Sequence, residues 1–152
     1  MTEQLLEPPT RTNPHRHLRV AESFGPTLQG EGPSSGRRAW FLRLSGCNLN
    51  CSWCDTPYTW DWNGQNGVAY DRSKESDRIP VARLVDRLAV HVADAGRLVI
   101  TGGEPMLQQT SLLQLVQQLP TVQIEVETNG TIPPSREWDL YRDRLQFNVS
   151  PK

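Results

Sequence analysis

Residues 46–62 read GCNLNCSWCDTPYTWDW, and this stretch holds all three cysteines of the 152-residue chain. Cys47, Cys51 and Cys54 follow the spacing C-x3-C-x2-C. Three thiolates so close together can bind one metal centre without ligands from distant sequence, and they leave one coordination position open. An open position on a metal is where a substrate or cofactor can bind. The stretch therefore predicts a reactive metal site.

Two kinds of metal centre fit these cysteines. A structural zinc site needs four protein ligands, and the candidates for a fourth are His15 and His17, at least thirty residues upstream. A solvated basic tail is the preferred interpretation of both histidines. A 4Fe–4S cluster bound by three cysteines instead leaves one iron free. The residues alone leave both metals open.

The composition is that of an ordinary globular protein. The chain is long enough for one domain, with 36% hydrophobic residues and a net charge of -1, so nothing indicates a nucleic-acid partner. No apolar run approaches the ~18 residues that span a bilayer, which argues against a membrane partner. The N-terminus lacks the apolar core of a signal peptide, and an odd, clustered set of cysteines favours a reducing compartment. We expect a cytoplasmic protein.

Residues 1–17 are polar and broken by three prolines, which predicts a flexible lead-in to a core at 18–152. Short apolar runs in the core predict strands at 18–24, 39–45, 98–101, 122–128 and 145–149. Amphipathic spacing predicts helices at 80–95, 110–119 and 135–144. Asp77 is the expected N-cap of the first helix, and Gly96 is expected to end it.

This order of elements is typical of a parallel βα array, either a barrel or an open sheet. No GxGxxG follows the first strand, so a dinucleotide site has no support. The strands end in the cysteine loop and in the clusters TGGEP, ETNG and SPK. Because carboxyl ends of parallel strands share one edge, we expect these motifs to form one site. Arg43, within the strand at 39–45, is a candidate to bind a carboxylate or phosphate, or to form a structural ion pair.

The cysteine spacing, with Trp53 before the last cysteine, resembles that of radical S-adenosylmethionine (SAM) enzymes. Gly102-Gly103-Glu104-Pro105 resembles the strand end that binds the methionine amino group in that family. There, the open iron of a 4Fe–4S cluster chelates SAM, and one electron from the cluster yields a 5′-deoxyadenosyl radical. The resemblance implies a partial parallel βα barrel of α/β class. Because the sequence stops at Lys152, we expect the barrel to be truncated at its C-terminus.

FGPTLQGEGPSSGRRAWFLRLSGCNLNCSWCDTPYTW, followed by TGGEP, ETNGT and SPK, resembles the 7-carboxy-7-deazaguanine synthases of queuosine-type 7-deazapurine biosynthesis. The resemblance covers about residues 18–152. It implies a lyase that converts 6-carboxy-5,6,7,8-tetrahydropterin to 7-carboxy-7-deazaguanine. The adenosyl radical would abstract the hydrogen at C6, the ring would contract and ammonia would be lost. Hydrogen return from 5′-deoxyadenosine would regenerate SAM. A homodimer and an electron donor such as flavodoxin are also implied.

The resemblance implies a role for each matching residue. The cluster would be held by Cys47, Cys51 and Cys54. SAM would contact Trp53, Cys54, Asp55, Gly103, Ser150, Pro151 and Lys152. The pterin would contact Leu28, Gln29, Gly30, Glu31, Arg43 and Thr101, with Arg43 paired with its carboxylate. Thr56 would bind a Mg²⁺ ion that bridges to this carboxylate, the alternative being a hydroxyl that hydrogen-bonds within its own turn.

Two other functions stay open from the sequence. One is a different radical SAM enzyme, such as a glycyl-radical activase, which shares the cysteine spacing but acts on a protein. Such an enzyme has no need of the QGEG loop or of Arg43 for a small carboxylate. The other is a truncated, non-catalytic metal-binding module that holds zinc or a degraded cluster.

Overall fold

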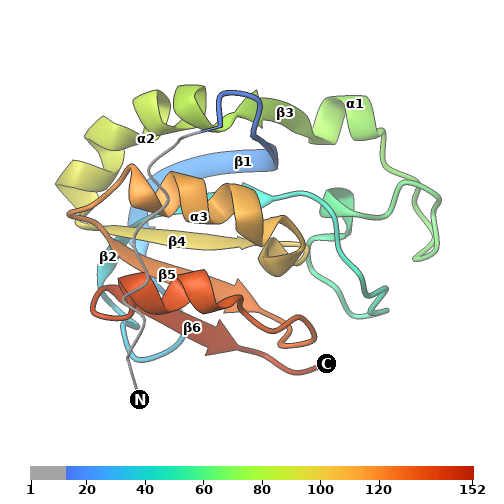
Figure 1. Ribbon diagram of the computed structural model, residues 1–152. Coiled ribbons are helices and arrows are strands. Elements are labelled where there is room, and N and C mark those ends of the chain that lie inside the picture. The colour runs from blue at the N-terminus through green and yellow to red at the C-terminus, as the bar shows by residue number, and fades with distance from the viewer. Residues whose placement is uncertain (1–12) are drawn as a thin grey trace, which may run out of the picture.

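Six strands form one sheet in the order β3-β1-β2-β4-β5-β6 in the computed structural model, which describes residues 13–152 (Figure 1). The predicted lead-in at 1–17 falls mostly outside these residues, and its last member, His17, already belongs to the sheet. The strands are β1 (His17–Leu28), β2 (Arg38–Leu44), β3 (Asp77–Pro80), β4 (Arg97–Gly102), β5 (Gln123–Thr128) and β6 (Leu145–Val149).

The sheet is mixed in strand direction. Strands β2, β4, β5 and β6 run parallel, as predicted, but β1 pairs antiparallel with both β2 and β3. The expectation of a parallel first strand was wrong, because the connection at 29–37 is too short for a parallel crossover, which needs about a dozen residues or more. Within residues 13–152, β3 and β6 each have one neighbour, so these strands form an open sheet. Barrel closure and truncation stay predictions.

β1 is longer than its predicted 18–24 and continues to Leu28 beyond a register shift between Phe24 and Thr27. Asp77 does not cap the following helix. It lies in β3 opposite Val20, and the residue before the helix is Pro80, which makes no side-chain cap. Pairing with β1 therefore outweighs the local capping preference of Asp77.

The helices match the predicted periodicity more closely. The α-helices are α1 (Arg72–Glu75), α2 (Val81–Ala95) and α3 (Gln109–Gln117). Gly96 ends α2 as expected, with a left-handed φ of 73° and an N–H that donates to the Val92 carbonyl at 2.7 Å. The helix predicted at 135–144 is a shorter 3₁₀ helix at Arg136–Tyr141, and further 3₁₀ turns occupy Pro57–Thr59 and Pro105–Gln108.

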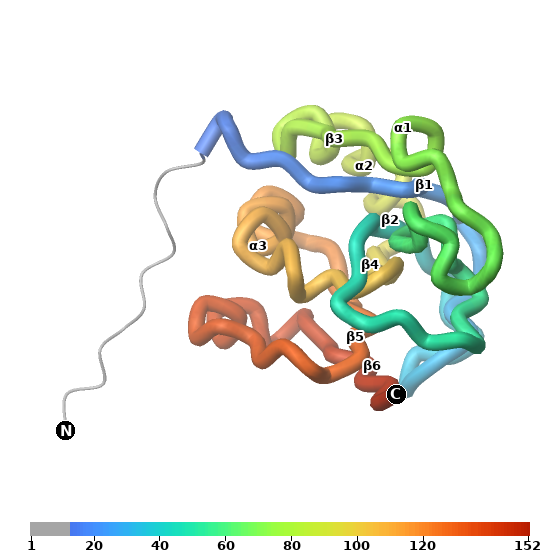
Figure 2. Tube along the Cα trace, turned by 90° about the vertical axis from the view of Figure 1, so that its right-hand side faces the viewer, coloured from blue at the N-terminus to red at the C-terminus, as the bar shows by residue number. Residues whose placement is uncertain are grey.

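The main hydrophobic core lies between the sheet and helices α2 and α3, which cover one side of it (Figure 2). Helix α2 contributes four buried positions at helical spacing, and α3 adds another apolar stripe. The strands contribute every second residue, as their period of two requires. These core residues include Leu42, Leu44, Leu84, Leu88, Leu98, Ile100, Leu112, Leu115, Ile124 and Val126.

The alternate strand residues point to the other face of the sheet, and this face becomes polar towards the carboxyl ends of the strands. Arg43 on β2 lies beside Thr101 on β4, and β5 places Glu125 and Glu127 on the same side. Figure 2 looks onto these strand ends and shows the cysteine loop and the C-terminus gathered there. The strand period therefore directs charged side chains to the end of the sheet where the motifs lie.

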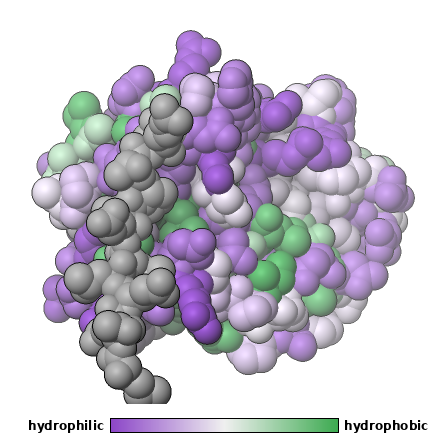
Figure 3. All heavy atoms as spheres, in the orientation of Figure 1, coloured by the Kyte–Doolittle hydropathy of each residue, from purple (hydrophilic) through white to green (hydrophobic). Residues whose placement is uncertain are grey.

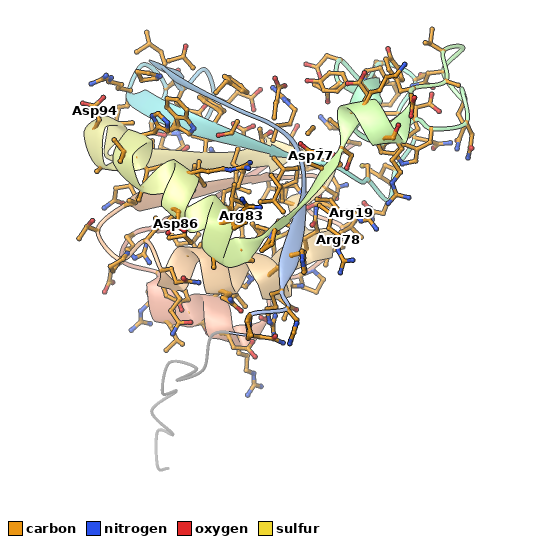
Figure 4. The ribbon with its side chains drawn as sticks, turned by 90° about the horizontal axis from the view of Figure 1, so that it is seen from above. Arg19, Asp77, Arg78, Arg83, Asp86 and Asp94 are labelled. Carbon is orange, nitrogen blue, oxygen red and sulfur yellow. The ribbon has the colours of Figure 1, made fainter. Side chains whose placement is uncertain are left out.

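The face of the molecule in Figure 3 is largely polar, with small groups of hydrophobic residues between charged ones. At the outer edge of the sheet, Arg19 on β1 lies beside Arg78 on β3 (Figure 4). The cation on the short edge strand β3, Arg78, disfavours addition of another strand. Among residues 13–152, no helix has the length and apolar character needed to cross a membrane.

Candidate functional site

A pocket with a volume of about 490 Å³ opens at the carboxyl ends of β2, β4, β5 and β6. It brings together segments that lie far apart in the sequence. The predicted site residues that line it are Gln29, Gly30, Glu31, Arg43, Cys47, Cys51, Trp53, Cys54, Asp55, Thr56, Thr101, Gly103, Ser150 and Lys152. Two predicted residues do not line it, namely Leu28, whose exposed fraction is 63%, and Pro151, which is also exposed.

The three cysteines lie on one wall of the pocket as free thiols. The backbone N–H of Leu49 donates to the Cys47 sulfur at 3.4 Å, and Nε1 of Trp60 donates to the Cys54 sulfur at 3.3 Å. Such donors stabilise thiolates and the sulfur atoms of a bound cluster. The loop thus already supplies hydrogen bonds that favour anionic sulfur.

Asp61 fixes the far side of the cysteine loop. Its carboxylate accepts 2.8 Å hydrogen bonds from the N–H groups of Gln65 and Asn66, and the Asn66 side chain donates to the Cys51 carbonyl at 3.0 Å. Burial alone would raise the pKa of Asp61, but the N–H groups of residues 63–66 outweigh it and lower this pKa. A charged Asp61 therefore keeps Cys51 in place.

Burial raises the pKa of the Cys47 thiol, although the N–H of Leu49 opposes the shift. The charges of Glu104, Cys54 and Cys51 raise it further. A thiol in this setting needs a nearby positive charge to ionise, and a metal centre supplies one.

In the part of the chain that the structure describes, no histidine joins the three cysteines in the pocket as the fourth ligand of a structural zinc site. Within residues 13–152, no three His, Cys, Asp or Glu side chains are placed to hold one metal ion. His15 and His17 do not line the pocket, and the His17 ring contacts the His15 carbonyl at 2.6 Å. Three free thiols at the edge of an open pocket fit a 4Fe–4S cluster, which three cysteines can hold while one iron stays free.

The two glycines of the TGGEP motif let β4 approach the start of the cysteine loop. A Cβ on Gly102 would overlap the Leu44 backbone, and one on Gly103 would overlap the Gly46 carbonyl. The N–H of Gly103 donates to the Leu44 carbonyl at 3.2 Å. The two glycines therefore serve the fit between two protein backbones, a role not assigned to them from the sequence.

Glu104 is fully buried and points into the protein. Its carboxylate accepts hydrogen bonds from Met106 N–H at 2.9 Å, the Thr128 hydroxyl at 2.8 Å and Asn129 N–H at 2.8 Å. A buried carboxylate with three donors is well compensated for its lost hydration. Glu104 therefore joins the ends of β4 and β5, while the neighbouring Gly103 faces the pocket.

The loop at 29–37 forms the opposite wall, and a second buried carboxylate anchors it. Gln29 donates from Nε2 to Glu125 at 2.9 Å and to Glu127 at 3.1 Å. Glu125 also accepts from the side chains of Ser34, Arg97 and Asn148. Burial would raise the pKa of Glu125, but these hydrogen bonds and the charge of Arg97 lower it overall.

Arg43 lies in the pocket wall and forms an ion pair, because its Nε donates to Glu22 at 2.7 Å. The structural alternative foreseen for this arginine is therefore present, and the side chain lines the pocket as well. Tyr58 donates its hydroxyl to the same carboxylate oxygen at 2.7 Å. Burial and this hydrogen bond raise the pKa of Tyr58 to about 12.

The remaining predicted residues lie around the rim. The Thr56 hydroxyl is 3.8 Å from the Cys54 sulfur, while its carbonyl accepts from Thr59 within the turn. Trp53 projects outward, with an exposed fraction of 70%. Ser150 is held by its N–H, which donates to the Thr128 carbonyl at 2.9 Å, and Lys152 donates to the Ser150 hydroxyl at 3.0 Å.

Some pocket residues had no role assigned from the sequence. Glu127, Thr128 and Asn129 line the pocket and belong to the ETNG cluster, which was recognised only as a strand end. Their position after a predicted strand was an available signal. Phe41 and Trp60 form apolar parts of the wall, and nothing in their local sequence distinguishes them from core residues.

Comparison with known proteins agrees with this arrangement. A family model described as a 4Fe-4S single cluster domain matches residues 28–131. A 7-carboxy-7-deazaguanine synthase from Hyperthermus butylicus is 40% identical over 138 residues, which cover 89% of this chain and 52% of the relative. The Escherichia coli enzyme of that name is 38% identical over 112 residues, covering 69% of this chain and 50% of the relative. The predicted resemblance is confirmed.

A solved structure, that of QueE from Escherichia coli, shares the fold. It superposes with a TM-score of 0.69 at 32% identity, covering 91% of this chain and 61% of that one. The chain spans about half the length of the curated relatives it matches. Because the family model matches more than half of the chain and its matched region contains all three cysteines, the chain belongs to the family of 4Fe-4S single cluster domains.

Proposed function

We propose that this protein is a 7-carboxy-7-deazaguanine synthase, a carbon–nitrogen lyase that acts on 6-carboxy-5,6,7,8-tetrahydropterin. The observation that carries the proposal is the shared pocket. It joins three cysteines, a Gly-Gly strand end and an arginine within one cavity of about 490 Å³. A glycyl-radical activase has no need of Arg43 or of the anchored loop at 29–37, and curated relatives named as synthases support the small-molecule substrate.

In this proposal Cys47, Cys51 and Cys54 hold a 4Fe–4S cluster. When bound, the cluster and SAM supply the electron and the radical chemistry that the protein itself lacks. Gly103 offers an open backbone to SAM, since any side chain there is excluded by the Gly46 carbonyl. The other proposed SAM contacts surround the cysteine wall, namely Trp53, Cys54, Asp55, Ser150, Pro151 and Lys152.

The opposite wall binds the pterin. Gln29, Gly30 and Glu31 are held in place through Glu125. Leu28, the residue before them, remains a proposed contact although it does not line the pocket. The guanidinium of Arg43 pairs with the substrate carboxylate, and Thr101, its neighbour on β4, lies within the same wall. A charged, planar fork suits a carboxylate, which can accept two parallel hydrogen bonds from it.

Conversion of the tetrahydropterin to the deazaguanine with release of ammonia is balanced in atoms and redox-neutral. The chain therefore has to orient the substrate and exclude water, and Phe41 and Trp60 provide apolar walls for this purpose. Thr56 is the proposed protein ligand of a Mg²⁺ ion shared with the substrate carboxylate, since Mg²⁺ binds through few protein oxygens and keeps other ligands from water and substrate.

The proposal extends to the cellular setting. It includes a cytoplasmic homodimer that receives electrons from a donor such as flavodoxin. A reducing compartment would protect the three free, clustered thiols from oxidation.

Anaerobic reconstitution with iron and sulfide tests this function. The protein is then incubated with SAM, a reductant and the carboxytetrahydropterin, and products are identified by chromatography and mass spectrometry. Formation of 7-carboxy-7-deazaguanine is expected. Release of 5′-deoxyadenosine without the deazapurine would identify a different radical SAM enzyme, and the absence of both would identify a non-catalytic module.

A further inference from the structure

Glu22 holds Arg43 from outside the pocket. The two residues are cross-strand partners on β1 and β2, and Nε of Arg43 donates to Glu22 at 2.7 Å. The Arg43 side chain is 19% exposed and lines the pocket, whereas the Glu22 side chain is 43% exposed and does not line it. Glu22 therefore reaches the arginine from its rear edge.

Tyr58 fixes Glu22 in turn. Its hydroxyl donates to the same oxygen, Oε1, at 2.7 Å. Tyr58 belongs to the 3₁₀ turn at Pro57–Thr59, directly after the cysteine loop, and it does not line the pocket either. One carboxylate oxygen thus connects the turn that follows the cysteine loop to the pocket-lining arginine on β2.

An aromatic pair restricts the guanidinium from its flat side. The Arg43 guanidinium carbon lies 5.6 Å from the centre of the Phe24 ring, a distance at which cation and ring attract. Phe24 is itself stacked on Phe41, with ring centres 5.1 Å apart and planes inclined by 8°. Contacts at Nε and at one face leave the guanidinium little freedom to rotate.

An arginine guanidinium carries five N–H donors, and Glu22 is bonded to the one on Nε. The two terminal nitrogens are then the ones that can receive a second carboxylate as a parallel pair of hydrogen bonds. The Tyr58 hydroxyl also donates to Glu22, so it offsets part of the negative charge of that carboxylate. Glu22 therefore neutralises less of the positive charge of Arg43, and Arg43 can still attract another anion.

We propose that Glu22 and Tyr58 are positioning residues that fix the Arg43 guanidinium so that its two terminal nitrogens receive the substrate carboxylate. This inference rests on the proposed function in one respect, the pairing of Arg43 with that carboxylate. It also explains specificity. A pre-oriented guanidinium strengthens the binding of pterins that carry the carboxylate, and it does not strengthen the binding of pterins without one.

Two stable fluorescent probes test the inference by equilibrium titration of the reconstituted protein. They are 6-carboxypterin and pterin, which differ only in the carboxylate. We expect Glu22→Ala to raise the Kd of 6-carboxypterin about tenfold and Tyr58→Phe to raise it about threefold, the range for loss of a charged or neutral hydrogen-bond partner. Neither substitution should change the Kd of pterin. Glu22→Gln keeps an acceptor oxygen and should restore most of the affinity.

Turnover gives an independent readout. The same variants should raise KM for the carboxytetrahydropterin and leave kcat within about twofold of the wild-type value. A misoriented Arg43 guanidinium weakens binding of the ground state and of the transition state equally. Asp94→Ala is the matched control. Asp94 also forms a 2.7 Å ion pair with an arginine, Arg38, but at the end of α2 that lies far from the cysteine loop (Figure 4).

The possible failures can be told apart. If wild-type protein binds both probes equally, the pairing of Arg43 with a carboxylate is wrong and the proposed function loses its support. If wild-type protein prefers 6-carboxypterin and the folded Glu22 and Tyr58 variants keep that preference, the positioning role alone is overturned. Equal weakening of both probes would also overturn it, because a general disturbance of the pocket does not distinguish the carboxylate. Thermal melting of each variant establishes that it is folded.

Discussion

Gln29 and Glu125 are joined by a 2.9 Å hydrogen bond that spans 96 positions of sequence and closes the loop at 29–37 onto the sheet. Both side chains are almost inaccessible, with exposed fractions of 2% and 0%. Four side chains donate to this one carboxylate, from the loop, β4 and β6. The pocket wall proposed to bind the pterin therefore depends on the buried carboxylate of Glu125, which is not itself a proposed pterin contact.

Glu125→Gln should weaken both the fold and substrate binding. The amide has one acceptor oxygen in place of two and brings a donor towards Gln29 and Arg97, so some donors lose their partner. Loss of a buried charged hydrogen bond costs about 1–3 kcal/mol, which should appear as a lower free energy of unfolding in urea. KM should rise while the iron content per chain stays at its wild-type value. An unchanged KM in the folded variant would show that the loop is held by other contacts.

Glu125 also predicts how stability depends on pH. Its pKa in the folded protein is lower than the ordinary value of 4.5, so its stabilisation is complete above that value and is lost as pH falls through the folded pKa. The free energy of unfolding should therefore decline from about pH 5 downward. Glu125→Gln, compared with wild type, should flatten this decline. Identical slopes for the two proteins would contradict the prediction.

Gly103→Ala should disturb the cysteine loop. The added methyl group overlaps the Gly46 carbonyl, and overpacking of this kind costs about 1–3 kcal/mol. Lower iron and sulfide content after reconstitution is expected, measured by chemical assay and by visible absorbance. Gly30→Ala is the comparison for iron loading, since a Cβ there meets no atom within 4 Å. Full iron loading of both variants would show that the loop can move aside.

Thr56→Ala should weaken the dependence of turnover on Mg²⁺. In the proposed site this hydroxyl is the protein ligand of the ion, and its loss leaves only substrate and water. Initial rates over a Mg²⁺ titration give the apparent constant, and Thr59→Ser in the same turn is the control, because it retains the hydroxyl that donates to the Thr56 carbonyl. A titration curve unchanged by Thr56→Ala would remove Thr56 from the metal site.

Much of the architecture follows from local sequence. The apolar stripe of 80–95, the stop at Gly96 and the four parallel strands are local patterns with a direct physical meaning, and the structure has them where they were predicted. Because the carboxyl ends of parallel strands share one edge of the sheet, the cysteine loop and the TGGEP, ETNG and SPK clusters that follow these strands lie close together. The pocket therefore could be outlined from the sequence, including Arg43 and the cysteines.

The parts that escaped prediction depend on tertiary contacts. Asp77 has the chemistry of a helix cap, yet strand pairing with β1 places it in β3. Glu125 looks like any alternate polar residue of a half-exposed strand, and only the covering loop at 29–37 makes it buried. Glu22 and Tyr58 are separated by 36 positions, and no local pattern reveals their shared hydrogen bond with Arg43.

In the proposed function, the rim of this sheet positions a carboxylated tetrahydropterin for radical ring contraction. The most direct test uses reconstituted protein, SAM, reductant and substrate carrying deuterium at C6. We expect 7-carboxy-7-deazaguanine with one ammonia released per product, and deuterium transferred into the SAM pool. A protein with a full complement of cluster iron that leaves the substrate unchanged would contradict it.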